Sequence, residues 1–358
     1  MSTERYEVVV VGGGPAGSAA AYTLAAAGKK VCLIDKAVFP RDKLCGGGLT
    51  FRSKIMFERI FKRSWKAELF ISSRNVSFFS KGRILASLKI SSKLYFTTRL
   101  SFDDYLLGLA RDAGTTLKLG DAVRKVDLER QSIALQSGEE VAFKFLIGAD
   151  GVNSLVAKTL FGKSFDPATI GFTLEAEVPR DRLPQQGDMV EFDFSAARWG
   201  YGWVFPKQES FTIGIGGIHR LNPDLRGRLD QYFQRKGLDS REFKVKGQYI
   251  PGGDYRVIPG RSNVLLCGDA AGAVDPISGE GIAFALQTGG AAGWAVATAL
   301  SHPADRSALE IYREYYSNVA ASLRRGKFWR CFIYPRLVEH LFAWAFKAEP
   351  IRKWILGG

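Results

Sequence analysis

Three runs dominated by apolar residues predict buried strands of a parallel sheet. They span residues 7–11, 143–147 and 263–267, and each leads into glycine or a short segment of small residues. Two segments rich in alanine and glycine, 16–27 and 281–300, have the composition of helices that pack closely against a sheet. With a further strand expected at 30–34, the chain begins with a βαβ half-unit of about thirty residues.

A different pattern occupies the middle of the chain. Residues 76–95 and 170–217 alternate aromatic or β-branched residues with polar ones and glycine, which predicts antiparallel strands of a second sheet. The other elements expected are helices at 51–70, 102–113 (with Ser101 as N-cap and Gly114 at its end) and 224–236, and short strands at 123–128 and 132–135. The first fold is therefore interrupted by the second and resumed after residue 254.

Composition narrows the class of protein. Of the 358 residues, 46% are hydrophobic and 24% are charged, which excludes a disordered or low-complexity chain. The four cysteines lie far apart without a CxxC pair, so we expect neither a disulfide framework nor a metal site. A reducing, cytoplasmic compartment fits this cysteine usage. No secretory signal begins the chain, and 281–300 is too rich in glycine, alanine and threonine for a membrane span.

The formal net charge of +14 is concentrated in two segments. Residues 324–358 contain eight basic and two acidic residues, and residues 51–70 contain six basic and two acidic residues. Both mix this charge with bulky aromatic and aliphatic residues, which is typical of helices that lie on a membrane surface. A set of partly packed, solvated helices explains the pattern equally well. No nucleic-acid recognition module is found, and the patterns do not indicate an oligomeric state.

The first chemical motif is the GxGxxG sequence formed by Gly12, Gly14 and Gly17, between the first strand and its helix. The glycines permit a tight turn, approach of a pyrophosphate to the backbone and close helix–sheet contact, while the helix N-terminus supplies a positive dipole. Asp35, at the end of the second strand, can accept hydrogen bonds from a ribose. The motif favours dinucleotide binding, and the alternative is a glycine-rich turn that holds no ligand. It does not choose between FAD and NAD.

Two further motifs supply that choice by resemblance. Residues 148–151 (GADG) and 263–272 (NVLLCGDAAG), taken with the N-terminal glycines, resemble the three fingerprints of the FAD-dependent hydroxylase superfamily, which has the p-hydroxybenzoate hydroxylase-like fold. The resemblance implies bound FAD, with Asp269 at the ribityl chain and Asp150–Gly151 near the pyrophosphate. It also places Arg99 near the flavin nucleotide. For Asp269 alone, a helix N-cap is the alternative.

The segment 275–282 (DPISGEGI) precedes the long small-residue helix. Its proline and glycines suit close approach of the backbone to a flat ring, and the helix N-terminus can stabilise negative charge on a reduced flavin. The alternative is a loop without cofactor contact. The residues expected to bind the cofactor are Gly12, Gly14, Pro15, Ala16, Gly17, Asp35, Lys36, Cys45, Gly46, Arg99, Val123, Asp150, Gly151, Gly268, Asp269, Pro276, Gly279, Gly281 and Ile282.

Residues 43–49 (KLCGGGL) and 201–206 (YGWVFP) resemble two segments of geranylgeranyl reductases. That group usually has a proline three residues before the tyrosine, where this chain has Arg198, so the exact substrate is not implied. The resemblance implies a substrate cavity lined by Tyr201, Trp203, Phe205 and Pro206, with Cys45 close to the flavin. Ordinary core packing is the alternative for the aromatic residues, and a small buried hydrophobe is the alternative for Cys45.

These motifs predict an α/β protein with a discontinuous Rossmann-type FAD-binding domain, an antiparallel-sheet substrate domain and a C-terminal helical segment. The domain boundaries expected are 1–70, 98–165 and 255–310 for the FAD-binding domain, 71–97 and 166–254 for the substrate domain, and 311–358 for the basic aromatic helices.

The function that the resemblance implies is saturation of C=C bonds in a prenyl lipid by hydride transfer from reduced FAD. Cys45 or a nearby water is the expected proton donor, and the external reductant is NAD(P)H or ferredoxin. A monooxygenase or tailoring oxidase on the same fold is the alternative, as is a flavin-containing lipid-binding protein without turnover. We expect a cytoplasmic protein, soluble or at the membrane surface.

Overall fold

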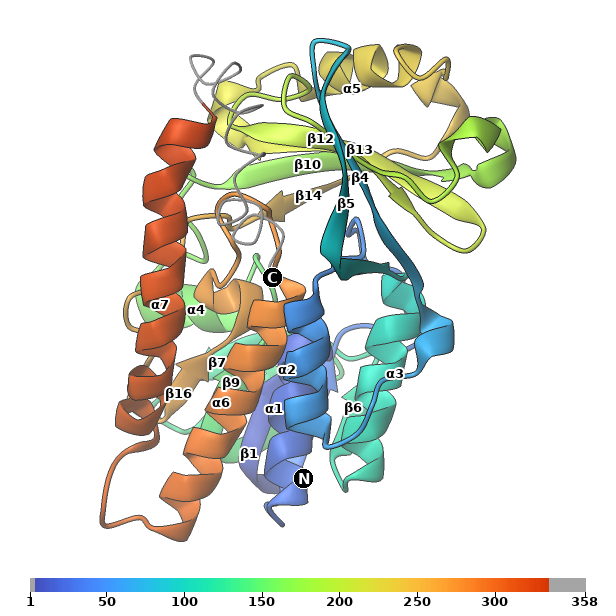
Figure 1. The fold of residues 1–358 in the computed structure, drawn as a ribbon. Helices are drawn as coiled ribbons and strands as arrows, with labels where there is room; N and C mark the ends of the chain where they lie inside the picture. The colour runs from blue at the N-terminus through green and yellow to red at the C-terminus, as the bar shows by residue number, and fades with distance from the viewer. Residues whose placement is uncertain (1–3, 335–358) are drawn as a thin grey trace.

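The computed structural model describes residues 4–334, which form two eight-stranded sheets and the helices around them (Figure 1). The first sheet and most of the helices make up the lower part of the view in Figure 1, and the second sheet makes up the upper part. Helix α7 (Ala308–Ile333) runs along one side from the lower part to the upper part. This is the α/β architecture expected from the sequence, although residues 335–358 of the expected basic aromatic segment lie outside the described residues.

The first sheet has the order β15–β16–β9–β1–β2–β6, and the hairpin β7–β8 joins it through β9. Val10 of β1 lies between Ile147 of β9 and Leu33 of β2, and all three are fully buried in a core that helices and the β7–β8 hairpin share. The strands of this sheet are β1 (Glu4–Val11), β2 (Val31–Asp35), β6 (Thr116–Leu119), β7 (Val123–Asp127), β8 (Ser132–Leu135), β9 (Glu140–Gly148), β15 (Gly260–Arg261) and β16 (Val264–Leu266).

The small-residue helices pack at very short range. A Cβ atom on Gly289 of α6 would lie 2.0 Å from the carbonyl oxygen of Ala16 in α1, and one on Gly293 would lie 2.6 Å from that of Ala20. The composition that distinguished these two segments in the sequence is therefore required by their contact. The α-helices of the described residues are α1 (Pro15–Ala26), α2 (Phe51–Phe61), α3 (Arg99–Asp112), α4 (Leu155–Phe161), α5 (Leu225–Gln234), α6 (Ile282–Ser301) and α7.

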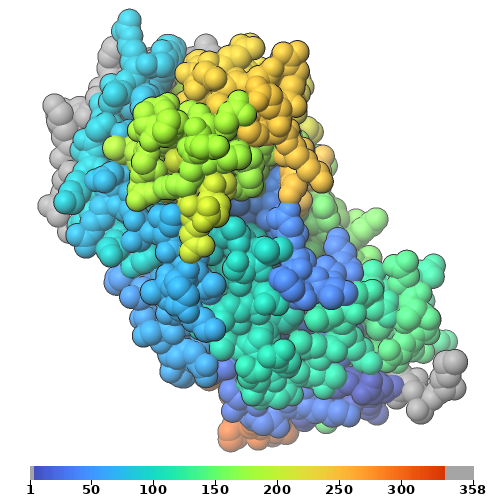
Figure 2. Space-filling model, turned by 90° about the vertical axis from the view of Figure 1, so that its right-hand side faces the viewer, coloured from blue at the N-terminus to red at the C-terminus, as the bar shows by residue number. Residues whose placement is uncertain are grey.

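The second sheet is mixed rather than wholly antiparallel, because β11 pairs in parallel with β4 while its other pairs are antiparallel. Helix α5 covers its outer face, where Leu229 and Phe233 pack with Val204 and Ile213. The strands of this sheet are β3 (Gly48–Leu49), β4 (Ile71–Ser80), β5 (Arg83–Phe96), β10 (Gly171–Pro179), β11 (Val190–Asp193), β12 (Gly200–Pro206), β13 (Ser210–Ile218) and β14 (Lys246–Ile250). In Figure 2 the green and yellow residues of this sheet and of α5 lie above the blue and cyan segments of the cofactor side.

Two expected elements differ from the structure. The helix expected at 51–70 ends at Phe61, because Lys62 adopts a left-handed conformation with φ 54°. The chain then folds back so that Trp65 stacks on Phe70 with ring centroids 4.2 Å apart, an arrangement that a continuous helix would prevent. The N-cap of α3 is Thr98 rather than Ser101, and its hydroxyl accepts a hydrogen bond from the Ser101 N–H.

Within residues 4–334, no helix is both long and apolar enough to cross a bilayer.

Candidate cofactor and substrate site

The glycine-rich turn after β1 brings the chain into contact with the turn after β9. Gly12 has φ +105°, and a Cβ atom there would lie 2.3 Å from the carbonyl oxygen of Ala149. A Cβ atom on Gly17 would lie 1.8 Å from the carbonyl oxygen of Gly12. Any side chain at either position would therefore push the turn apart. Both glycines shape the turn, while Gly14, Pro15 and Ala16 line the adjoining cavity at the N-terminus of α1.

Asp35 holds the same turn from the end of β2. Its carboxylate accepts hydrogen bonds from the N–H of Gly13 at 2.6 Å and of Ala37 at 2.8 Å. Lys36 is exposed. Val123 is the first residue of β7, three residues after Gly120, whose N–H donates to the Ala37 carbonyl. Asp35 and Lys36 thus lie at the end of β2, and these two residues and Val123 are outside the lining of the cavity.

A buried cluster of two arginines and one aspartate lies beside the glycine turn. The fully buried Asp103 carboxylate binds Arg99 through two hydrogen bonds of 2.6 Å and lies 2.9 Å from Arg41 Nη2. Burial alone would lower the pKa of Arg99, but Asp103 raises it, so the guanidinium stays charged. The Arg41 Nη1 atom is buried without a hydrogen-bond partner in the described structure. The cluster therefore carries a net positive charge and a vacant donor.

Residues 45–48 form a strap between the two sheets. The buried Lys207 ammonium donates to the carbonyl oxygens of Gly46 and Thr97, each at 2.6 Å. A Cβ atom on Gly47, which has φ +66°, would lie 2.1 Å from both the Lys207 Nζ atom and the Thr97 oxygen. Cys45 faces the cavity, and its sulfur accepts a hydrogen bond from the Gly47 N–H at 3.4 Å. Lys207 thus fixes the strap, although burial lowers the pKa of its ammonium group.

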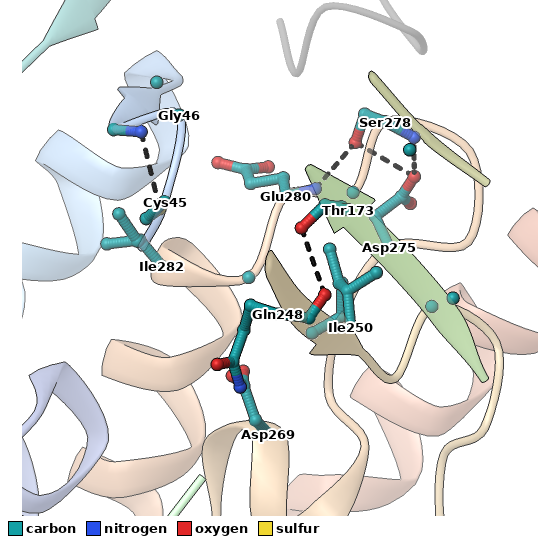
Figure 3. A pocket seen from close by; sticks show the side chains of 18 of the residues that line it. Cys45, Gly46, Thr173, Gln248, Ile250, Asp269, Asp275, Ser278, Glu280 and Ile282 are labelled. Atoms are coloured by element: carbon teal, nitrogen blue, oxygen red, sulfur yellow. Dashed lines mark hydrogen bonds between the residues drawn. The ribbon is translucent and has the colours of Figure 1, made fainter. Parts of the chain in front are cut away.

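The segment between Asp269 and α6 closes the opposite side of the cavity (Figure 3). The Asp275 carboxylate accepts from the N–H groups of Ile277 and Ser278 and shapes the turn. The Tyr201 hydroxyl donates to the Ser278 carbonyl from the second sheet. These contacts place Pro276, Gly279, Gly281 and Ile282 on the cavity wall.

Glu280 ties this segment to α2. Its carboxylate accepts from the Thr50 hydroxyl at 2.5 Å and the Ser53 hydroxyl at 3.1 Å, while burial raises its pKa. In Figure 3, Glu280 and Cys45 approach the cavity from different segments, and Thr173 donates to the carbonyl oxygen of Gln248 on the neighbouring strand at 3.1 Å. The cavity has a volume of about 270 Å³ and lies between the two sheets.

The second sheet supplies an aromatic wall. Tyr201, Trp203 and Phe205 alternate along β12 and all three face the cavity, together with Phe192 of β11. Pro206 lies outside this lining. The Trp203 Nε1 atom is buried and has no partner among the described residues, so its N–H is available to a ligand.

Asp150 is held by the residues that begin α4 (Leu155–Phe161). Its carboxylate accepts from the Ser154 hydroxyl at 2.5 Å and the Val156 N–H at 3.2 Å, which directs it to the start of α4. Burial raises the pKa of Asp150. Gly151, by contrast, lines the cavity.

Of the residues expected from the sequence, the cavity lining brings together Gly14, Pro15, Ala16, Cys45, Gly46, Arg99, Gly151, Tyr201, Trp203, Phe205, Gly268, Asp269, Pro276, Gly279, Gly281 and Ile282. Gly12, Gly17, Asp35, Lys36, Val123, Asp150 and Pro206 lie outside it.

The sequence analysis missed Arg41, Glu175 and Lys207, which are isolated charged residues without a motif. It counted Arg330 among the basic residues of a membrane-surface segment, but this side chain is buried. The Arg330 guanidinium, from the last turn of α7, donates to the carbonyl oxygens of Gly252 at 2.8 Å and Trp199 at 3.2 Å. Only the fold brings these four residues to the site.

The comparisons with known proteins agree with this geometry. The model of the FAD binding domain family matches residues 5–178 and 256–326. Together with the two-sheet fold and the glycine turn, this defines an FAD-dependent oxidoreductase. Geranylgeranyl diphosphate reductase of Rhodobacter capsulatus is 33% identical over 294 residues, which cover 78% of this chain and 72% of that protein. The chain belongs to the geranylgeranyl reductase family, within the FAD-dependent hydroxylase-like superfamily.

Other relatives extend the comparison. An uncharacterized protein of Methanosarcina barkeri is 31% identical over 340 residues, covering 94% of this chain and 86% of its own length. Menaquinone reductase of Mycobacterium tuberculosis is 33% identical over 318 residues, covering 79% and 74%. A solved geranylgeranyl bacteriochlorophyll reductase-like structure from Thermoplasma acidophilum shares the fold with a TM-score of 0.75 and 24% identity, over 96% of this chain and 88% of its own.

The residues of the site fit FAD in three respects. The glycine turn leaves room for a pyrophosphate. A Cβ atom at Gly12 or Gly17 would displace the backbone and remove this room. The unpartnered Arg41 Nη1 atom lies in a net positive cluster next to that turn. The N-termini of α1 and α6 both adjoin the cavity, where their dipoles favour negative charge.

Proposed function

We propose that the protein is a reductase that saturates C=C bonds of a prenyl, geranylgeranyl-type chain. The observation that carries this proposal is the aromatic wall of the second sheet, where Phe192, Trp203 and Phe205 face the strap that contains Cys45. A long unsaturated hydrocarbon has no polar group to hold along its length, so an apolar wall suits it. The relatives named for geranylgeranyl diphosphate and for digeranylgeranylglycerophospholipid support the same substrate class.

The chain holds the cofactor mainly through backbone and positive charge. The turn at Gly12, Gly14 and Gly17 accommodates the pyrophosphate, and Arg41 and Arg99 neutralise it. Asp35 would hold the ribose, Asp269 would hold the ribityl chain, and the start of α6 would stabilise negative charge on the ring. When bound in its reduced form, FAD supplies a hydride to one carbon of the alkene. The division into a cofactor domain (1–70, 98–165 and 255–310) and a substrate domain (71–97 and 166–254) belongs to this proposal.

The protein residues then act by alignment and by exclusion of water. The aromatic side chains of β12 hold the alkene against the strap, and the Trp203 N–H orients a polar group that enters the cavity. The strap itself is immobilised by Lys207, so the spacing between the sheet and the cofactor side is fixed.

An anaerobic experiment tests the function. The purified holoprotein is reduced with dithionite, and geranylgeranyl lipids are added. The flavin spectrum is then followed, and the masses of the products are measured by mass spectrometry. We expect the flavin to be re-oxidised and the product to gain two hydrogens per turnover. Because the electrons are supplied chemically, the result does not depend on whether NAD(P)H or ferredoxin is the natural donor. A flavin that stays reduced with every lipid, but reacts with oxygen to hydroxylate an aromatic substrate, would replace the reductase by a monooxygenase.

Cys45 is tested in the same assay. The Cys45→Ala variant is expected to slow saturation while retaining FAD, because the thiol lines the cavity from the strap. Equal turnover of the variant and the natural protein would remove Cys45 from the chemistry and leave it a packing role.

We also propose that the end of α7 contacts a membrane surface. Phe328, Trp329 and Phe332 form a cluster of touching rings and are about half exposed, next to the basic Lys327. The test is co-sedimentation with anionic vesicles. A variant with serine at all three aromatic positions is expected to bind less, whereas Tyr315→Ser, at an exposed aromatic earlier on the same helix, is expected to bind normally. Equal binding of both variants would overturn the proposal.

A further inference from the structure

Four carboxyl groups line the cavity, and among the residues that the structure describes one of them, Glu175, has no side-chain partner. Within residues 4–334, Glu175 forms neither an ion pair nor a hydrogen bond with another side chain, and it is 6% exposed. The other three, Asp269, Asp275 and Glu280, are held by neighbours. Those neighbours are Lys43 for Asp269, the Ile277 and Ser278 N–H groups for Asp275, and the Thr50 and Ser53 hydroxyls for Glu280.

The position of Glu175 follows from the register of the sheet. Glu175 of β10 lies opposite Gly214 of β13, and Gly214 lies opposite Trp203 of β12. A Cβ atom on Gly214 would lie 2.7 Å from the Glu175 Cβ atom and 2.4 Å from the Trp203 ring. The two side chains therefore occupy the space that a side chain at Gly214 would fill. Glu175 also approaches the backbone N–H of Cys45, so it lies where the sheet meets the strap.

The positive charges near Glu175 offset only part of the effect of burial on its pKa. Lys207 is engaged by the Gly46 and Thr97 carbonyls, and Lys246, on the adjacent strand, pairs with Asp42.

Glu177, the next residue on the same face of β10, carries a like charge. Burial raises the pKa of Glu175 to about 7, against the smaller opposing effects of Lys207, Lys246 and the Cys45 N–H. A substantial fraction of the carboxyl group is therefore protonated near neutral pH, and it is a stronger acid than a thiol with an ordinary pKa of about 8.5.

We propose that Glu175 is the acid that protonates the substrate during saturation, an inference that rests on the proposed function. The Glu175 O–H bond breaks and its proton forms a C–H bond at the alkene carbon next to the one that receives the hydride. The C=C π bond is lost, and the alkene is reduced by the two electrons of that hydride, which come from the reduced cofactor. Glu175 is left as a carboxylate and recovers a proton from water before the next turnover. Cys45 then has a positioning role on the strap.

The test compares Glu175→Gln with Glu177→Gln. Glu177 is exposed and bonds Ser210 and Thr212 at 2.6 Å, so its variant is a matched control on the same strand. FAD content, affinity for a geranylgeranyl lipid and anaerobic re-oxidation of the reduced flavin are measured from pH 5 to 9. A separate readout, independent of turnover, is the infrared C=O band of carboxylic acids followed through the same pH range.

We expect Glu175→Gln to bind FAD and lipid normally but to re-oxidise on the order of 10²-fold more slowly. The rate of the natural protein and of Glu177→Gln falls as pH rises past about 7, and a carboxylic acid band disappears over the same interval; Glu175→Gln lacks both changes. Re-oxidation of Glu175→Gln within twofold of the natural rate, or no band assignable to Glu175, would overturn the inference. If the natural protein leaves every prenyl lipid unchanged, the proposed function fails, and the inference fails with it whatever the band shows.

Discussion

Replacing Asp103 with asparagine removes the only carboxylate of the buried arginine cluster while nearly preserving its volume. Asp103 is fully buried and is bound by two hydrogen bonds to Arg99 and by an ion pair to Arg41. The variant leaves two buried guanidinium groups without a counter-charge. Breaking a buried ion pair from one side costs about 3–5 kcal/mol. If each kcal/mol lowers Tm by about 2 °C, the apoprotein should melt roughly 6–10 °C lower.

The cofactor should change this outcome in a particular direction. The FAD pyrophosphate carries negative charge next to Arg41 and Arg99, so it partly replaces the missing carboxylate. We therefore expect the difference in Tm between Asp103→Asn and the natural protein to be smaller with bound FAD than without it. Calorimetry of the stripped and the reloaded proteins measures both differences. Asp104→Asn, at the exposed neighbouring position, is the control and should melt normally in both forms.

Two results would refute the reasoning. If the free energy of unfolding of the Asp103→Asn apoprotein lies within about 1 kcal/mol of that of the Asp104→Asn control, the buried ion pair contributes little to stability. A deficit that is equal with and without FAD would show that the two guanidinium groups do not face the pyrophosphate.

Further predictions concern Gly17 in the glycine turn, the contact of Tyr201 with Ser278, and the carboxyl group of Glu175. Gly17→Ala should raise the Kd for FAD at least about tenfold, since its Cβ atom would lie 1.8 Å from a carbonyl oxygen. Gly108→Ala, with open space around the new Cβ atom, is the control and should bind FAD normally. Fluorescence titration of the apoproteins measures both values of Kd. Tyr201→Phe removes the hydrogen bond to the Ser278 carbonyl and should lower the free energy of unfolding by about 1–2 kcal/mol in urea titrations, so an unchanged midpoint would contradict it. Glu175 binds its proton more tightly when folded, so stability should fall as pH rises from 4.5 to about 7, by about 3 kcal/mol in all, and Glu175→Gln should lack this slope; parallel slopes would contradict it.

Much of the cofactor side could be predicted because its residues are constrained locally. Gly12 and Gly17 are required by contacts within one turn, and the small residues of α1 and α6 by the contact between these helices. Such constraints leave a fixed spacing that can be recognised in a sequence. The same is true of the strands of the first sheet, whose apolar runs reflect burial on both faces.

The rest of the site depends on contacts between distant segments. Arg41 is an ordinary basic residue until α3 brings Asp103 to it, and Glu175 has the alternation of a solvent-facing strand position. Its burial requires the register that sets Gly214 beside it and the strap that passes over it. The end of α2 at Phe61 was likewise unpredictable from periodicity, because it depends on the packing of Trp65 against Phe70.

The contacts of Arg330 bear on how the protein is made. Its guanidinium closes one wall of the cavity by binding Gly252 and Trp199, yet it is translated after both sheets. The glycine turn and the arginine cluster leave the ribosome early, and β16 and the start of α6 complete the cradle before α7 emerges. We therefore expect FAD to enter most easily during synthesis, through the side that α7 has not yet closed. A chain produced under flavin starvation is therefore expected to acquire its cofactor more slowly than one synthesised with flavin present.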